Sequence, residues 1–241
     1  MSEQFSYNYG DYYSKDRFAK YRFDIAKHLL LPYIKENVKI LDIGCYDGAM
    51  LDAIRKSANQ IDYTGIDADS KALDIAASRG AKVLKLNIES DNLPFQSDSF
   101  DIIIIGEVLE HLKDPARILS FAKNVLKTKG ILLVSLPNEC TIYHRLKILF
   151  GRGIDGTGFA PGYHLHFPTL KQNEDFVQQF FKIEEKKYWY HLGVGGVLEK
   201  LLNFIPHSFL QFLVNLFPNL LARGIIILCK NHKSNAKEVN R

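Results

Sequence analysis

A glycine-flanked turn that carries two acidic residues is the first feature of this sequence with chemical potential. Asp42 lies near the end of the apolar run 38–43, and Asp47 lies between Gly44 and Gly48. Glycine adopts backbone angles that other residues avoid and lets a ligand approach the main chain closely. The GxxxG spacing differs from the GxGxxG of dinucleotide-binding turns, and the Lys-Ser/Thr pair of a P-loop does not follow it. The two acids favour a ligand with an ammonium or sulfonium group over a pyrophosphate; the alternative is an ordinary strand–helix turn.

Asp67 is another candidate ligand-binding acid, because it ends the next strand-like run. An acid about twenty residues after a glycine turn can accept hydrogen bonds from both hydroxyls of a ribose. Asp67 could instead cap a helix, although Asp69 or Ser70 is better placed for that role.

Two groups of carboxylates and histidines could act as bases or metal ligands. Glu107, Glu110 and His111 have the spacing that brings side chains to one side of a helical turn. His164 and His166 follow a glycine-rich stretch in which a loop is expected. The alternative for each group is a structural role, in which the side chains pack and form hydrogen bonds.

Strand-like and helix-like runs alternate through the middle of the chain. The expected strands are 38–43, 61–66, 81–86, 100–105 and 131–136, and the expected helices are 49–57, 70–79 and 114–127. Pro115 lies in the first turn of the last helix and Gly130 lies just past its predicted end. Such alternation with short connections indicates a parallel sheet with helices on both faces. Ligands bind such sheets at the carboxyl ends of the strands, so we expect the chemistry directly after each strand.

Four segments of the chain resemble the class I S-adenosylmethionine-dependent methyltransferases of the broad small-molecule type. They are LDIGCYDG (41–48), GIDAD (65–69), LPFQSDSFDIIIIGEVLEHLKDP (93–115) and GILLVSLPN (130–138), in the family's order and at its spacings. The resemblance implies an α/β fold with a Rossmann-like, seven-stranded mixed sheet of order 3-2-1-4-5-7-6, in which strand 7 is antiparallel and helices cover both faces. Two C-terminal runs fit strands 6 and 7, at 181–190 and 224–229, and Thr169 with Gln172 forms a capping box before the first of them.

The resemblance also implies S-adenosyl-L-methionine as the cofactor. The positions that match the family's contacts to the methionine part of the cofactor are Asp42, Gly44, Cys45, Tyr46, Asp47, Gly48, Gly106 and Glu107. Asp67 matches the acid that binds the ribose, and Ala68 would lie beside the adenine. The family usually has an Asp where this chain has Asn87; an amide oxygen can still accept from the adenine amino group. Ile88 would offer its backbone N–H to the ring.

The reaction that the resemblance implies is in-line transfer of a methyl group from a sulfonium, which is already activated. The enzyme must align the acceptor with the methyl carbon and exclude water. A general base is needed only for a poor nucleophile such as a hydroxyl. The predicted base is His166, or else His164, and Glu107 is a further candidate.

A metal-assisted reaction on RNA is an alternative hypothesis. Some RNA 3′-end methyltransferases hold a metal with a similar ExxEH run and a later histidine, which here would be Glu107, Glu110, His111 and His166. The EVLEHL run also occurs in relatives that use no metal, so we expect none. The formal charge is only +4, and the last twelve residues carry four Lys/Arg and one Glu, so we expect no nucleic-acid partner. A cofactor-binding protein without catalysis, acting as a partner or regulator, is the remaining alternative.

The apolar segment before the last expected strand is longer than the short turn that the fold needs there. Polar residues recur every four positions in it, from Asn203 to Asn219, and Pro206 and Pro218 should each begin a short helix. The segment could wall the substrate pocket as a lid, form a homodimer face or contact a membrane surface through 197–222. We therefore expect a small or medium-sized acceptor, with an apolar, sugar-linked or lipid-linked one as the sharper hypothesis.

We expect one domain over 1–241. Its parts are an N-terminal lid or helix (1–36), a cofactor-binding core (37–140), a substrate loop (141–168), a C-terminal half (169–230) with the apolar helical insertion (195–222), and a basic tail (231–241). Four tyrosines between positions 7 and 13 could close the lid over the site or pack on the sheet edge. The few, dispersed cysteines and the absence of an apolar run at the start lead us to expect a cytoplasmic protein, with peripheral membrane contact as the variant.

Overall fold

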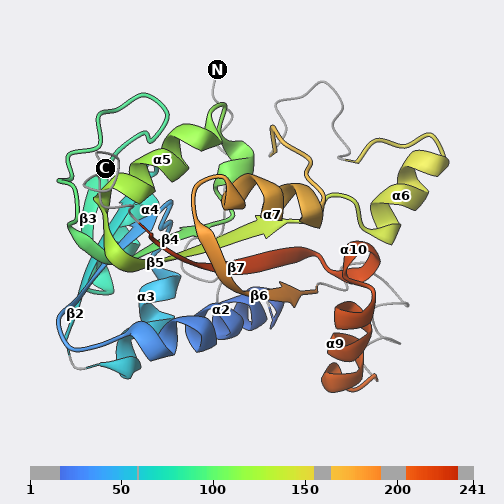
Figure 1. Cartoon of the computed structure of the whole chain (residues 1–241), viewed down its shortest axis with the longest axis horizontal. Helices are drawn as coiled ribbons and strands as arrows, with labels where there is room; N and C mark the ends of the chain where they lie inside the picture. The colour runs from blue at the N-terminus through green and yellow to red at the C-terminus, as the bar shows by residue number, and fades with distance from the viewer. Residues whose placement is uncertain (1–16, 59, 155–163, 191–204, 233–241) are drawn as a thin grey trace, which may run out of the picture.

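The computed structural model describes residues 17–58, 60–154, 164–190 and 205–232, and Figure 1 shows their arrangement. The strands are β1 (Val38–Ile43), β2 (Ile61–Asp67), β3 (Lys82–Lys85), β4 (Phe100–Gly106), β5 (Leu126–Pro137), β6 (Lys182–Trp189) and β7 (Gly224–Lys230). They form one sheet in the order β3-β2-β1-β4-β5-β7-β6. β7 runs antiparallel to both of its neighbours, and the other pairs are parallel. The predicted fold class and strand order are confirmed.

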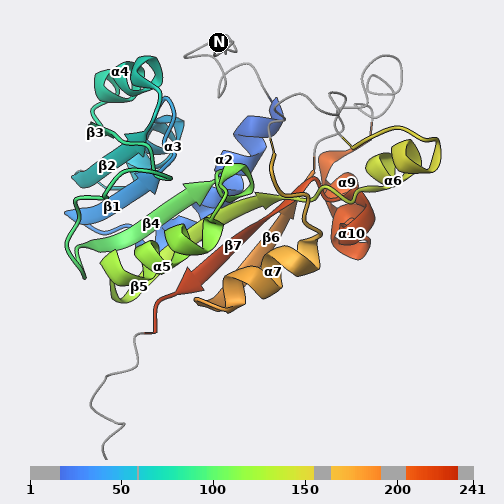
Figure 2. The ribbon, with the colours of Figure 1, turned by 90° about the horizontal axis from the view of Figure 1, so that it is seen from above.

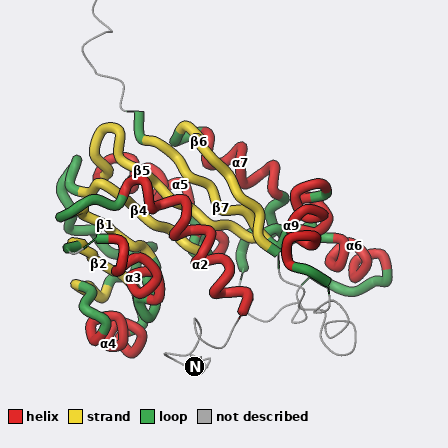
Figure 3. The backbone as a smooth tube through the Cα atoms, turned by 90° about the horizontal axis from the view of Figure 1, so that it is seen from below, coloured by secondary structure: helices red, strands yellow, loops and turns green. Residues whose placement is uncertain are grey.

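Helices cover both faces of this sheet. They are α2 (Arg17–Leu30), α3 (Ala49–Ile54), α4 (Ser70–Ser78), α5 (Pro115–Val125), α6 (Ile142–Leu149), α7 (Leu170–Gln178), α9 (His207–Leu216) and α10 (Pro218–Leu221), with short 3₁₀ turns at Leu31–Tyr33, Arg55–Ser57 and Leu109–His111. α5 and α7 lie on one face, while α2 and α3 lie on the other (Figures 1 and 3).

The central strand β4 shows why four consecutive isoleucines, at 102–105, are needed there. Ile103 and Ile105 pack with α5 on one face, and Ile102 and Ile104 pack with α2 and α3 on the other. Alternate side chains of a strand point to opposite faces, so a strand covered on both sides needs an apolar residue at every position.

The predicted starts of four helices are confirmed. Asp69 caps α4 by accepting from the backbone N–H groups of Lys71 and Ala72. Thr169 and Gln172 form the capping box of α7. The two prolines of the apolar segment begin the short helices α9 and α10 as expected.

The predicted end of the helix 114–127 is wrong. α5 ends at Val125, β5 begins at Leu126, and Gly130 lies within that strand. The amide of Asn231 explains the early end, because it donates to the carbonyl oxygens of Leu126 and Lys127 and fixes this stretch outside the helix. Asn231 lies more than a hundred residues away, so no local pattern shows this contact.

The N-terminal helix and the apolar insertion meet at the edge of the sheet. The Tyr21 hydroxyl of α2 donates to Gln211 Oε1 of α9 at 2.6 Å, and its ring packs against His207 and Tyr190. The tyrosine cluster at 7–13 and part of the insertion lie outside the described residues. Seen from above, α6, α9 and α10 lie together at one end of the sheet (Figure 2). Among the described residues, no helix has the length and apolar character needed to cross a bilayer.

Candidate functional site

A cavity of about 810 Å³ opens at the carboxyl ends of β1, β2, β4 and β5. Most residues that the sequence predicted for the cofactor line it, and they are Asp42, Gly44, Cys45, Tyr46, Asp47, Asp67, Ala68, Asn87, Ile88, Gly106 and Glu107. Of the other predicted residues, His164 also lines the cavity. Gly48 begins α3 beside the cavity, and His166 lies outside its wall. The sheet thus brings together side chains that are up to 122 residues apart in sequence, from Asp42 to His164.

The turn after β1 needs its glycines for conformation and for space. Gly44 and Gly48 have φ of 74° and 75°, where a side chain is strained. A Cβ atom on Gly44 would lie 2.4 Å from Val108 Cγ2, and one on Gly48 would lie 3.0 Å from Ala76 Cβ. At Gly106 a Cβ atom would meet nothing within 4 Å, so this glycine leaves the cavity floor open. The resulting bare backbone is suited to the close approach of a ligand.

Asp67 is held in place by two backbone N–H groups. Its Oδ2 accepts from Tyr46 N at 2.9 Å, and its Oδ1 accepts from Asp69 N at 2.9 Å. Each carboxylate oxygen keeps capacity for a further hydrogen bond, which is what a ribose diol would use. Because Asp69 caps α4, the alternative role of Asp67 as the helix cap does not apply.

The two acids of the glycine turn differ in their surroundings. Asp47 is buried, accepts from Ala49 N at 3.1 Å and lies 3.3 Å from Arg79 Nη2, which balances its charge. Asp42 accepts a hydrogen bond from the Tyr63 hydroxyl and has no such cation beside it among the interactions of the described residues. The pKa of Asp42 is raised to about 7, chiefly by burial; the hydrogen bond from Tyr63 lowers it and the nearby charge of Asp67 raises it. Asp42 is therefore the acid of this turn that a cationic ligand would stabilise.

The loop after β3 is fixed by an arginine that the sequence analysis missed. Arg117 of α5 donates to the carbonyl oxygens of Ile88 at 2.5 Å, Glu89 at 3.1 Å and Asp91 at 2.9 Å. Asn87 Oδ1 accepts from Glu89 N at 3.0 Å, and its second lone pair is open to a ligand. Only a three-dimensional contact between α5 and this loop shows the role of Arg117.

Glu107 is held at the end of β4 by two residues from distant segments. Its Oε1 accepts from the Ser135 hydroxyl at 2.6 Å, and its Oε2 lies 3.6 Å from Arg22 Nη1. The backbone has a φ of 55° at Glu107, and its N–H donates to Ser135 O at 3.1 Å. Glu107 therefore lies at the cavity wall in a fixed orientation, and Arg22 and Ser135 are further wall residues that sequence reasoning missed.

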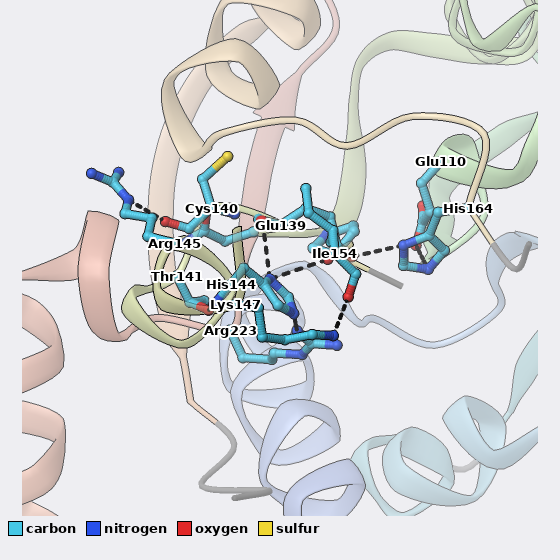
Figure 4. Close-up of polar contacts among 12 residues, drawn as sticks. Glu110, Glu139, Cys140, Thr141, His144, Arg145, Lys147, Ile154, His164 and Arg223 are labelled. Carbon is cyan, nitrogen blue, oxygen red and sulfur yellow. Dashed lines mark hydrogen bonds and ion pairs between the residues drawn. The ribbon is translucent and has the colours of Figure 1, made fainter. Parts of the chain in front are cut away.

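A buried carboxylate orients the histidine that faces the cavity (Figure 4). His164 Nδ1 lies 2.7 Å from Glu139 Oε1, which leaves the Nε2 lone pair of a neutral ring directed away from that bond. Burial raises the pKa of Glu139, but the hydrogen bond with His164 and the charge of Arg223 outweigh it and lower the pKa overall. His144 Nδ1 contacts Glu139 O at 2.9 Å, and burial lowers the pKa of this second histidine. The arrangement is a carboxylate–imidazole pair suited to proton transfer.

Glu110 is the least satisfied polar group of the site. Its side chain is buried, and neither carboxylate oxygen has a hydrogen-bond partner among the described residues. Burial, with the charge of Glu107 second, raises its pKa to about 9. Its backbone oxygen accepts from Leu165 N at 2.8 Å and His166 N at 3.2 Å, and so it anchors the segment that carries His164.

One set of side chains in the described structure has metal-ligand geometry. Ligand atoms of Glu110, His111 and His164 lie within 4.8 Å of one another. The set expected from the ExxEH run is not assembled with His166, whose Nε2 contacts the Leu112 carbonyl oxygen at 2.8 Å. The same three groups can instead serve proton transfer, because burial raises the pKa of Glu110 and favours its protonated form.

Comparisons with known proteins agree with this geometry. A family model described as a methyltransferase domain matches residues 13–186. A ubiquinone biosynthesis O-methyltransferase of Actinobacillus pleuropneumoniae is 30% identical over 51% of this chain and 59% of its own length. A ubiquinone/menaquinone biosynthesis C-methyltransferase of Campylobacter jejuni is 33% identical over 42% of this chain and 46% of its own length. The matches therefore span about half of the curated relatives.

A solved structure shares the fold over nearly the whole chain. The N-methyltransferase NodS from Bradyrhizobium japonicum, determined in complex with S-adenosyl-L-homocysteine, aligns with a TM-score of 0.58 at 14% identity. The alignment covers 92% of this chain and 91% of that one. At this identity the likeness shows a common fold.

Proposed function

This chain belongs to the methyltransferase-domain family, and we propose that it transfers the methyl group of S-adenosyl-L-methionine to a small or medium-sized acceptor. The observation that carries the proposal is the convergence of the predicted cofactor residues on one cavity at the strand ends. The residues fit the cofactor, because Gly44 and Gly106 leave bare backbone and Asp42 is a buried acid with no cation beside it in the described part of the chain. When bound, the cofactor supplies a methyl group activated by a sulfonium.

Each part of the cavity has a role in binding. Asp42 pairs with the cationic end of the cofactor, and Asp67 accepts from its ribose hydroxyls. Asn87 and Ile88 contact the adenine from the loop that Arg117 fixes. These contacts hold the donor so that the acceptor meets it in line, which lowers the barrier because the two reactants are already oriented.

His164 is the group that we assign as general base. Glu139 orients the His164 ring, so that Nε2 would accept the proton of an acceptor hydroxyl as its oxygen takes the methyl group. The donor sulfur would keep the electron pair of the broken carbon–sulfur bond and leave as a neutral thioether. Glu139 is a positioning residue in this scheme, and Glu107 positions the end of β4. His166 has no such partner and contacts a backbone carbonyl instead.

The acceptor that we propose is apolar and sugar-linked or lipid-linked. The cavity extends beyond the predicted cofactor residues towards Ile154 and Phe167, which offer apolar contact, and His144 and Arg223, which offer polar contact. Two relatives are named for the biosynthesis of ubiquinone or menaquinone, which are apolar quinones. We further propose that the protein acts in the cytoplasm at a membrane surface. A homodimer through the same apolar segment is the alternative.

A metal-assisted reaction on RNA is the second candidate, because Glu110, His111 and His164 have metal-ligand geometry. One assay separates the two functions. The intact protein is incubated with labelled S-adenosylmethionine and either a panel of lipid-linked phenols and sugar-linked hydroxyl compounds or RNA, with and without EDTA. The proposal predicts label in at least one compound of the panel, and EDTA should leave that label unchanged. Label in RNA that EDTA abolishes would establish the second candidate, and no turnover with either would favour a non-catalytic cofactor-binding protein.

A further inference from the structure

An apolar surface is exposed at one end of the molecule. Eleven of the fifteen exposed large hydrophobic side chains in the described residues lie in two segments. The first segment is α6 with Phe150, which follows it, and the second runs from α9 to α10. We call them the α6/α9 face: Ile142, Tyr143, Leu146, Ile148, Leu149, Phe150, Phe209, Phe212, Leu216, Phe217 and Leu221. All three views place α6 and α9 at this same end (Figures 1, 2 and 3). Large apolar side chains gathered at one end of a molecule in this way indicate an interaction surface.

The degree of exposure is highest at the end of α6. Leu149 is 74% exposed and Phe150 is 76% exposed, while Phe212 of α9 is 60% exposed. Because large apolar side chains gain by leaving water, such exposure disfavours a surface that faces only solvent. Neither helix is long enough to cross a bilayer, so the geometry fits contact along a surface.

The described segments that carry this face hold basic residues and no acidic ones. Residues 140–154 include Arg145, Lys147 and Arg152 and no acidic residue, and residues 205–223 include Arg223 and no acidic residue. Arg145 and Arg152 are exposed. A second copy of this chain would bring like charges together across a two-fold interface. An anionic lipid surface would complement them, since each basic residue near such a surface is attracted to it.

The other side of α6 faces the cavity. His144 lies in α6, is buried and lines the cavity, as does Ile154, which follows the helix. Lys147, which also lies in α6, ties the helix to Ile154, because its Nζ donates to Ile154 O at 2.6 Å (Figure 4). α6 is therefore a thin wall between the acceptor end of the cavity and the α6/α9 face.

We propose that the α6/α9 face docks on an anionic lipid bilayer, so that the acceptor end of the cavity lies at the membrane surface. The inference rests on the proposed function for the identity of the site. It goes beyond the apolar insertion alone, because α6 supplies the most exposed side chains and the basic residues. A lipid-linked acceptor could then keep its apolar chain in the bilayer while its polar end reaches His164.

Vesicle flotation of the full chain tests the docking. We use vesicles of phosphatidylcholine and vesicles in which phosphatidylglycerol is added. The intact protein should float with the anionic vesicles and less with the neutral ones, and salt should weaken binding. The double variant Leu149→Glu, Phe150→Glu should bind the anionic vesicles at least about a hundredfold more weakly, which is about tenfold for each side chain changed. The double variant Arg145→Gln, Arg152→Gln should lose the preference for anionic vesicles.

Leu31→Glu is the matched control, because Leu31 is 41% exposed and lies outside the face. It should float as the unchanged protein does. Calorimetric binding of S-adenosylhomocysteine is measured for every variant, so that loss of docking is distinguished from loss of the cofactor site. The proposal is overturned if the intact chain floats with neither vesicle or if the Leu149, Phe150 variant floats unchanged. A dimer in sedimentation velocity that this variant dissociates would show that a second copy covers the face.

Discussion

At the scale of single residues, Asp42 should link cofactor binding to pH. Its raised pKa of about 7 means that the carboxyl is mostly neutral below that pH and ionised above it. A cationic ligand pairs with the ionised form, so affinity for S-adenosylhomocysteine should rise about tenfold between about pH 6 and about pH 8. Calorimetry at several pH values measures this, and Asp42→Asn should make the affinity independent of pH over this range. A pH-dependence that Asp42→Asn leaves intact would assign it to another group.

The same pKa shift affects the stability of the unliganded protein. The folded state binds the Asp42 proton more tightly than the unfolded state, whose carboxyl has the ordinary value. The contribution of this group to stability is therefore fully present below about pH 4 and is lost as the pH rises to about 7. The unfolding free energy of the Asp42→Asn variant, measured with urea, should lack this pH-dependent contribution. The difference in unfolding free energy between the two proteins should then vary across this window.

His164 and His166 provide a matched pair, because they lie two residues apart and only His164 is paired with a carboxylate. With a hydroxyl acceptor, His164→Gln should lower kcat by about 10²–10⁴-fold, and His166→Gln should leave it near the unchanged value. Glu139→Gln should shift the pH profile of kcat, because it removes the charge beside the imidazole. Equal kcat values for the two histidine variants would contradict the assignment of the base.

At the scale of elements, the turn after β1 and the end of β4 should tolerate substitution differently. Gly44→Ala places a side chain on a residue with a left-handed backbone conformation, which costs about 1–2 kcal/mol. The new Cβ atom would also collide with Val108 Cγ2. Gly106→Ala meets nothing within 4 Å. Urea unfolding should therefore show a destabilised Gly44→Ala and a nearly unchanged Gly106→Ala, whereas calorimetry should show weaker S-adenosylhomocysteine binding for Gly106→Ala. A Gly44→Ala variant as stable as the unchanged protein would contradict this description of the turn.

The elements of the sheet were largely predictable, because their signals are local. The continuous apolar run at 100–105 predicts a strand covered on both faces, and the positions of Asp69, Thr169 and Pro218 predict helix starts. The end of α5 was not predictable, since it depends on Asn231 from the far end of the chain. Local sequence patterns report the torsional and capping preferences of a few residues, and they carry no information on such long-range contacts.

The residues of the site likewise divide into those that local sequence predicts and those that only long-range contacts reveal. Asp42 and Asp67 lie in the last residues of two neighbouring strands, so their convergence could be expected from parallel-sheet topology. Arg79, Arg117 and Glu139 have no local motif, and their roles appear only when separate segments meet. The choice between His164 and His166 depends on which ring reaches Glu139, which the sequence spacing does not distinguish.

At the scale of the whole molecule, the cavity connects two chemically different ends. The end near Asp67 and Asn87 is built from the loops after β2 and β3, and the end near His144 and Ile154 lies beside α6. Tyr21 joins α2 to α9 through its hydrogen bond to Gln211. The strand ends thus form one part of the cavity, while His144, Ile154, His164 and Phe167 form the other.

The central claim, that this cavity binds the methyl donor, is tested most directly by calorimetric titration with S-adenosylhomocysteine. The unchanged protein should bind with micromolar affinity, and Asp67→Asn should bind about tenfold to a hundredfold more weakly because it loses a charged hydrogen-bond acceptor. Asp62→Asn is the control, since Asp62 lies on the same strand and pairs with Lys82 at the surface. The account predicts that Asp62→Asn binds as the unchanged protein does. No binding by the unchanged protein, or equal binding by Asp67→Asn, would contradict it.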